Sequence, residues 1–446
     1  FQISNAVIEP LIRPSEDGTK LQPGLASSWR FNSDNTVLTI RLNRKATFSD
    51  GTPVTTEDVA FSVETWKSGE SYGSTYGVID HTTIVDSRTI ELHLVYPDAA
   101  LSAYLSWAAA GVMPDEFGGR SAQEYYQDPI GAGAFTVESW SPNGLVELEK
   151  SPHYYRPGRP HVDEIVSSFA ADPNSVSLQI RAGQIDLADE VLPVAAISLA
   201  DDQVKAEPVH LTPVLLMNTK DDALSDVAVR RAIAYGIDYD AIVASALKGY
   251  GVPPTGPLPP NSANWAPPSE PYFAHDPDQA ESLLSSASNP PDTVALTYPN
   301  DPSSALMAQV IQQNLDDIGI DVELQAADSA TEFANLSSGN YQLGIFSTNA
   351  ISPDVSDPAW YVAATKTMFT GYPTGSAVKA LAAYAAAETS QERKAEVVKL
   401  QDIWADDVPY VALAHTSALE AQGSGVHGVH VTPWGSYYFD SVWKSS

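Results

Sequence analysis

The two ends of this chain carry one kind of pattern, and its middle carries another. Residues 37–42 alternate apolar and polar side chains, as a half-buried strand does, and residues 426–443 are again β-like. Helical patterns become frequent only from residue 214 onward. A chain that leaves its first domain and returns to it must cross between domains twice. The pattern therefore predicts an α/β fold with a hinge of two crossing strands, without strict alternation of strand and helix.

Capping signals place several helices. Thr55 precedes a helical pattern with Glu57 and Asp58 in its first turn, where negative charge opposes the helix dipole. Ser225 is expected to cap a helix over 226–235. Asp238 is expected to cap a second helix that ends at Gly249.

Charge and cysteine content exclude several classes of protein. The 446 residues hold 24 Lys and Arg against 56 Asp and Glu, a net charge of −32, and no Cys. A nucleic-acid-binding protein needs a basic face, which this balance disfavours. The absence of Cys excludes disulfide scaffolds, thiolate zinc sites and cysteine nucleophiles. The length predicts about three domains of ~150 residues each.

Searches for catalytic motifs give nothing specific. The chain has no serine-hydrolase elbow, metalloprotease helix or phosphate-binding glycine loop. His427 and His430 lie three apart in a β-like segment, where such residues point to opposite faces. We therefore expect no enzyme activity, no cofactor and no metal site. Pairs of acidic residues leave one alternative class open, a secreted glycoside hydrolase that uses two carboxylates.

One loop is unusual in composition. The segment 351–361 follows the apolar run 343–346. It contains two prolines together with Asp354, Asp357, Trp360 and Tyr361. Loops that follow strands often contact ligands. The competing interpretation is a proline turn that packs Trp360 into the core.

Motifs along nearly the whole chain resemble those of the family 5 extracellular solute-binding proteins, the peptide/nickel-type (cluster C) receptors of ABC importers. They occur in the family's order, and they are the runs 21–29 (LQPGLASSW), 48–59 (FSDGTPVTTEDV), 129–135 (PIGAGAF), 181–186 (RAGQID) and 226–238 (DVAVRRAIAYGID).

The resemblance implies a bilobed periplasmic-binding-protein-like fold (type II, cluster C) with an extra domain and a discontinuous first domain. The expected domains are 1–30, 160–210 and 425–446 (domain I) with 31–159 (domain II) in lobe 1, and 211–424 (domain III) in lobe 2. It also implies a monomeric receptor outside the cytoplasm, in the periplasm or on the cell surface, whose closed form docks on ABC transporter permease subunits. A further strand and a lipid-anchor cysteine are expected upstream of Phe1.

The resemblance also suggests ligand contacts. Glu9 matches a position that lies near the ligand in peptide receptors, and Asp354 matches the aspartate that pairs with a peptide's α-ammonium. A buried ammonium needs such a carboxylate, because an unpaired buried charge is costly. The arginine that dipeptide receptors use for the ligand's carboxylate aligns near Tyr298, which cannot neutralise a carboxylate. A strict dipeptide receptor is therefore disfavoured.

The ligand class predicted first is a peptide, enclosed between two lobes and delivered to a membrane permease. Asp357, Trp360 and Tyr361 complete the expected ligand-binding set. An oligosaccharide stacked on Trp360 or Tyr361 is the alternative within the same family. Another neutral or cationic solute, including a chelated metal, also stays open.

Overall fold

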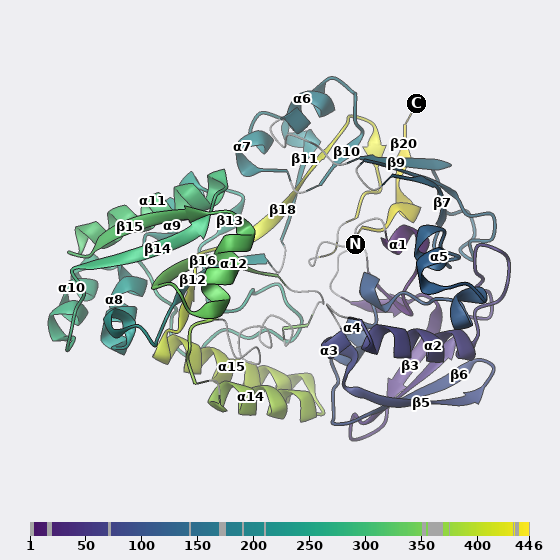
Figure 1. Ribbon diagram of the computed structural model, residues 1–446, viewed down its shortest axis with the longest axis horizontal. Helices are drawn as coiled ribbons and strands as arrows, with labels where there is room; N and C mark the ends of the chain where they lie inside the picture. The colour runs from purple at the N-terminus through teal and green to yellow at the C-terminus, as the bar shows by residue number, and fades with distance from the viewer. Residues whose placement is uncertain are drawn as a thin grey trace.

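Two pairs of strands cross side by side between the halves of the computed structural model (Figure 1). β11 (Val204–Pro208) precedes β12 (Leu211–Met217), and β17 (Tyr410–Ala412) precedes β18 (His415–Gln422). β18 pairs with β11, while β12 pairs with β17, both antiparallel. The expected double crossing is thus confirmed, and it joins two lobes.

The structure describes the following residues: 4–15, 20–69, 73–141, 144–168, 175–189, 191–208, 211–349, 354–355, 369–373, 375–430, 432 and 437–445. We call residues 4–168 and 426–445 lobe 1, and residues 211–412 lobe 2, in each case within the described ranges. The finer division into three domains stays a prediction.

Lobe 1 is built on antiparallel sheets. One has the order β3-β4-β6-β5, and another has the order β7-β8-β9. The strands are β1 (Ile12–Pro14), β2 (Leu21–Pro23), β3 (Ala26–Phe31), β4 (Val37–Leu42), β5 (Ile79–Asp86), β6 (Thr89–Leu94), β7 (Phe135–Trp140), β8 (Leu145–Lys150), β9 (Glu164–Ser168), β19 (Val426–His427) and β20 (Trp443–Lys444). The helices are α1 (Ser4–Val7), α2 (Thr56–Lys67), α3 (Gly73–Tyr76), α4 (Leu101–Tyr104) and α5 (Ala122–Gln127). The predicted strand over 37–42 is confirmed as β4.

Helix α2 begins where its sequence predicts. The backbone N–H of Thr55 donates to Oδ2 of Asp58 at 2.7 Å, which is half of a capping box. Val59 and Val63 face the core of lobe 1 and are fully buried. Burial of such an apolar face, rather than helix propensity, provides most of a helix's stability in a protein.

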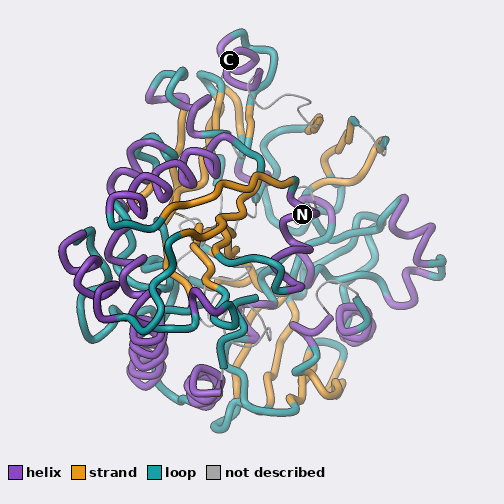
Figure 2. The backbone as a smooth tube through the Cα atoms, turned by 60° about the vertical axis from the view of Figure 1, so that its left-hand side comes forward, coloured by secondary structure: helices purple, strands orange, loops and turns teal. Residues whose placement is uncertain are grey.

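Lobe 2 surrounds a mixed five-stranded sheet of order β15-β14-β16-β12-β17. β14 (Thr293–Pro299) runs parallel to both β15 (Asp321–Ala327) and β16 (Leu343–Asn349). The helices are α8 (Val227–Gly236), α9 (Tyr239–Ser245), α10 (Pro277–Ser286), α11 (Pro302–Asp317), α12 (Ser329–Ser338), α14 (Gly375–Ala386) and α15 (Ser390–Asp407). Figure 2 shows strands throughout the molecule with helices packed around them.

Two helix boundaries in lobe 2 differ from those predicted. The cap of α8 is Asp226, not Ser225, and its side chain accepts from the backbone N–H of Ala228 at 2.9 Å. Asp238 does cap α9, but that helix ends at Ser245 rather than near Gly249. Adjacent Ser and Asp are both good caps, so the pattern could not choose between them.

Between the lobes, β18 also pairs with the short strands β10 (Leu187–Ala188) and β13 (Gly251–Val252). Two short helices, α6 (Val176–Arg181) and α7 (Pro193–Ala196), pack beside it. Across the crossing, the hydroxyl of Thr416 donates to the carbonyl oxygen of Leu211 at 2.7 Å. β18 is therefore the main element shared by the two halves.

Candidate functional site

Asp354 lies in lobe 2 and is 8% exposed. Its backbone forms a parallel β-bridge with Ala263, and the N–H of Val355 donates to the carbonyl oxygen of Ala263 at 3.1 Å. This contact holds Asp354 against the long proline-rich segment that follows β13. Of the loop predicted from composition, residues 351–361, only Asp354 and Val355 are described.

Both carboxylate oxygens of Asp354 accept hydrogen bonds from uncharged donors. The hydroxyl of Tyr384, on α14, donates to Oδ1 at 2.5 Å, and Nδ2 of Asn264 donates to Oδ2 at 3.0 Å. Nδ2 of Asn264 also lies 3.1 Å from the Tyr384 hydroxyl. Burial, followed by the charge of Asp354, raises the pKa of Tyr384, so this hydroxyl stays protonated as a donor. The carboxylate is therefore oriented without being neutralised by these two groups.

Asp98, which the sequence interpretation did not single out, lies close enough to Asp354 to feel its charge. Asp98 belongs to lobe 1, where its Oδ1 accepts from the N–H of Ala100 at 2.9 Å before α4 begins. Burial raises the pKa of Asp98 to about 6, and the charge of Asp354 adds to the rise. One carboxylate of lobe 1 and one of lobe 2 thus interact electrostatically. The only sequence signal for Asp98 was that of an aspartate near a helix start.

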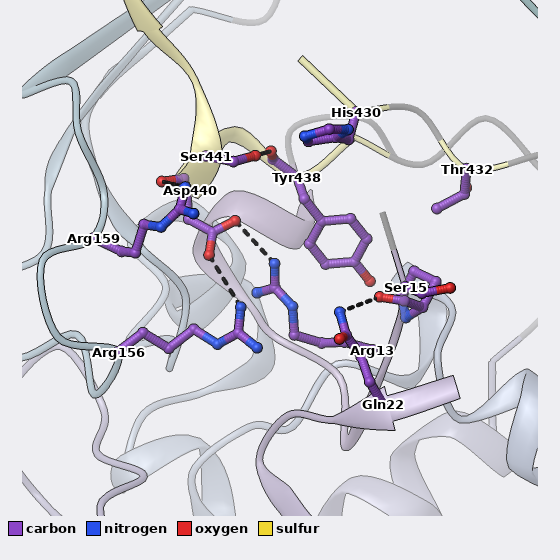
Figure 3. Close-up of a pocket in the computed structure, with 11 residues that line it drawn as sticks. Arg13, Ser15, Gln22, Arg156, Arg159, His430, Thr432, Tyr438, Asp440 and Ser441 are labelled. Carbon is purple, nitrogen blue, oxygen red and sulfur yellow. Dashed lines mark hydrogen bonds and ion pairs between the residues drawn. The ribbon is translucent and has the colours of Figure 1, made fainter. Parts of the chain in front are cut away.

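Glu9 lies in a different cluster, inside lobe 1. It is 1% exposed, and its Oε1 accepts from Nη1 of Arg13 at 3.1 Å and from the hydroxyl of Tyr155 at 2.7 Å. Arg13 reaches on to Asp440, with Nη2 2.9 Å from Oδ1 (Figure 3). The structure therefore gives Glu9 a buried cationic partner of its own, and a role in ligand contact stays a prediction.

The cluster around Arg13 draws on segments that are far apart in the sequence. The Tyr154 hydroxyl donates to Oδ2 of Asp440 at 3.1 Å, and the Arg13 guanidinium lies 4.2 Å from the centre of the Tyr438 ring. Burial alone would raise the pKa of Asp440, but the charges of Arg13 and Arg156 and the hydrogen bonds from Arg13 and Tyr154 hold it below its usual value. Sequence reasoning missed this cluster, because a local motif cannot predict a contact such as that of Arg13 with Asp440, which lies more than 400 positions away.

Four further residues were predicted to bind the ligand, and the described structure does not show them in contact with Asp354. Tyr298 lies near the end of β14, half-buried against the apolar core of lobe 2. Asp357, Trp360 and Tyr361 lie outside the described residues.

Within the described part of the chain, no three or more histidine, aspartate or glutamate side chains are placed to hold a metal ion. Among the same residues, no helix is both long and apolar enough to cross a membrane.

The model of the bacterial extracellular solute-binding proteins, family 5 Middle, matches residues 20–369 of this chain. A curated relative, "Probable D,D-dipeptide-binding periplasmic protein DdpA" of Escherichia coli strain K12, is 28% identical over 447 residues, covering 95% of this chain and 85% of its own. The glutathione-binding protein GsiB of Pectobacterium atrosepticum is 27% identical over 446 residues, covering 95% and 86%.

Solved structures agree on the fold. The binding protein AgaA of Agrobacterium tumefaciens strain R10, in complex with agropinic acid, has a TM-score of 0.81 at 25% identity, covering 100% of this chain and 94% of its own. NikA from Brucella suis, in complex with Fe(III)-EDTA, has a TM-score of 0.87 at 21% identity, covering 100% and 95%. The bilobed fold is thereby confirmed, and the chain belongs to the family 5 bacterial extracellular solute-binding proteins.

Proposed function

We propose that this protein is the peptide receptor of an ABC importer and that Asp354 holds the ligand's α-ammonium group. The observation that carries the proposal is the buried Asp354 carboxylate, oriented by Tyr384 at 2.5 Å and Asn264 at 3.0 Å. Neither of these two donors carries a positive charge that would neutralise the carboxylate. Charge-assisted hydrogen bonds to a buried carboxylate are roughly twice as strong as neutral ones.

Asp98 extends this site to the other lobe. Its interaction with Asp354 is repulsive when both carboxylates are charged, which disfavours bringing the two lobes together. An ammonium group placed between them turns that repulsion into attraction. A ligand that interacts differently with open and closed states shifts the population toward closure, and here the differential contact is the bridged carboxylate pair.

The ligand is proposed to be longer than a dipeptide. Tyr298 offers no positive charge to a ligand's carboxylate, so that carboxylate must be met elsewhere or left to solvent. Relatives named for D,D-dipeptide and glutathione binding support the peptide class. An oligosaccharide remains the alternative that depends on Trp360 and Tyr361. AgaA, which was solved with agropinic acid, supports other small solutes.

The finer features of the receptor are proposed on the basis of family membership. The protein binds and releases its ligand without catalysing a reaction, acts as a monomer outside the cytoplasm, and docks its closed form on permease subunits. The three domains follow the bounds given above, and a lipid anchor, where present, precedes Phe1. Glu9, which is paired with Arg13 in lobe 1, is proposed to lie near the ligand.

A thermal-shift screen of the purified protein tests the proposal. Tri- to pentapeptides should raise the melting temperature, because a ligand that binds only the folded state stabilises it. Each stabilising compound is then incubated with the protein and followed by mass spectrometry. An oligosaccharide that alone stabilises the protein would favour the alternative ligand class. Its hydrolysis, abolished by Asp354→Asn, would show a glycoside hydrolase and contradict the receptor.

A further inference from the structure

Lobe 1 contains a pocket of about 400 Å³, part of it open to solvent, at the junction of three distant segments (Figure 3). The β1–β2 hairpin contributes Arg13 and Gln22, and the connector that follows β8 contributes Arg156 and Arg159. The segment before β20 contributes Tyr438 and Asp440. All of its lining residues belong to lobe 1, so the pocket does not depend on how the two lobes are placed.

Among the described residues that meet there, positive charge exceeds negative charge. The guanidinium groups of Arg13 and Arg156 pair with the carboxylate of Asp440, and that of Arg159 donates to its backbone oxygen. Glu9 pairs with Arg13. Counting these five residues gives 3 − 2 = +1. The whole chain has a net charge of −32, so this local excess is opposite in sign to the rest of the protein.

Two of the arginines have donors that the described residues leave unused. Nε of Arg13 is buried and has no hydrogen-bond partner, although only 6% of that residue is exposed. Arg159 donates from Nη1 to the backbone oxygen of Asp440 at 3.2 Å and forms no ion pair with a described carboxylate. A buried donor without a partner costs free energy, so an acceptor that reached Arg13 would stabilise the fold.

We propose that this pocket binds a small oxyanion, such as inorganic phosphate, sulfate or a free carboxylate. Guanidinium groups present planar forks of N–H donors that match the oxygens of these anions. Gln22 and Tyr438 border the same space and add a polar rim. The anion would join the hairpin, the connector and the C-terminal segment, and it would balance the excess charge. This site is separate from Asp354, and it does not rest on the proposed peptide function.

Isothermal titration calorimetry tests the site in the full-length protein. Phosphate, sulfate and acetate are titrated separately, with chloride at matched ionic strength as the reference. The oxyanions should bind while chloride does not. Arg159→Gln and Arg156→Gln should each weaken binding roughly tenfold or more, as expected when a charge-assisted hydrogen bond is lost. Arg231→Gln is the matched control, because this arginine lies in lobe 2 in a surface pair with Asp406. It should leave anion affinity unchanged.

The source of the anion and the location of the site are resolved separately. Tighter binding of phosphate or sulfate than of acetate would assign an inorganic ligand, and the reverse order would assign a carboxylate. Anomalous scattering from a selenate-soaked crystal should place the anion between Arg156 and Arg159, even if a variant fails to fold. Equal heats for every anion and chloride, or unchanged affinity in both folded variants, would overturn the proposal. Peptide affinity is unaffected in either case, so the two proposals fail independently.

Discussion

The Tyr384 hydroxyl donates to Oδ1 of Asp354 at 2.5 Å and so helps to orient this carboxylate in lobe 2. Replacing this tyrosine by phenylalanine removes one donor and leaves the Asn264 contact in place. We expect Tyr384→Phe to weaken peptide binding about tenfold, which corresponds to one hydrogen bond to a charged group. Titration calorimetry with a stabilising peptide measures the change.

Tyr341 provides the control for this variant. It belongs to the same apolar cluster as Tyr384, and its buried hydroxyl has no partner in the described structure. Tyr341→Phe should therefore leave peptide affinity unchanged. Equal affinity in both variants would show that Tyr384 does not position Asp354 for the ligand.

Asp98→Asn should change how stability depends on pH. The pKa of Asp98 is raised to about 6 in the folded protein, against an ordinary value of 3.8. Its favourable contribution is present below pH 3.8 and is lost as the pH rises through 6. The variant should therefore lose less stability between pH 4 and pH 7 than the wild type. Thermal melts of the ligand-free protein across this range measure the difference.

The exposed Asp163 in lobe 1 is the control for Asp98. Its side chain is 93% exposed and lies 3.6 Å from Lys150. Asp163→Asn should follow the wild-type pH dependence. If Asp98→Asn follows it as well, the pKa of Asp98 is not raised in the folded protein.

Glu420, on β18, makes the crossing strands sensitive to pH. It is 1% exposed, and burial raises its pKa to about 7 from 4.5. The unfolded chain releases this proton near pH 4.5, so the contribution to stability present below that pH is lost as the pH rises through 7. Glu420→Gln should remove the loss and stabilise the protein above pH 7 by up to about 3 kcal/mol. Urea unfolding at pH 5, 6, 7 and 8 measures this, with exposed Glu323→Gln on β15 as the control. Parallel curves for wild type and Glu420→Gln would exclude the effect.

Asp440→Asn should destabilise lobe 1. The change removes the carboxylate 2.9 Å from the buried Arg13 and leaves Glu9 as the one described carboxylate that pairs with that arginine. Breaking a buried ion pair costs about 3 kcal/mol or more, whereas an exposed pair is worth about 1 kcal/mol or less. Asp406→Asn, which removes the exposed partner of Arg231, is the control. The folded-state pKa of Asp440 is lowered, so its contribution is full above pH 3.8 and is lost as the pH falls below it. Similar unfolding free energies for both variants would contradict the role given to this cluster.

The sequence predicted what depends on local pattern. The alternation in β4 and the cap of α2 were found because the signals lie within a few residues of the elements they define. The two crossing strand pairs followed from matching patterns at the ends of the chain. Family motifs indicated Asp354 as a ligand contact, and that role stays a prediction.

What could not be predicted depends on contacts between distant segments. Arg13 and Asp440 are 427 positions apart in the sequence. Asp354 and Tyr384, which form a hydrogen bond, are 30 positions apart. Asp98 carries no signal of its own, because its interaction with Asp354 arises only when the two lobes are placed together. The role of Glu9 likewise could not be settled from its motif, since its partner Tyr155 lies 146 positions away.

The central claim is that Asp354 holds the α-ammonium group of a peptide. Titration calorimetry tests it most directly, when wild type and Asp354→Asn are each titrated with one peptide in its free and its N-acetylated form. The account predicts that wild type binds the free peptide and that acetylation weakens binding by a hundredfold or more, because it removes the ammonium charge. In Asp354→Asn the free peptide should lose most of its affinity, and acetylation should make little further difference. Equal affinity of wild type for both forms, or undiminished binding of the free peptide by Asp354→Asn, would contradict the account.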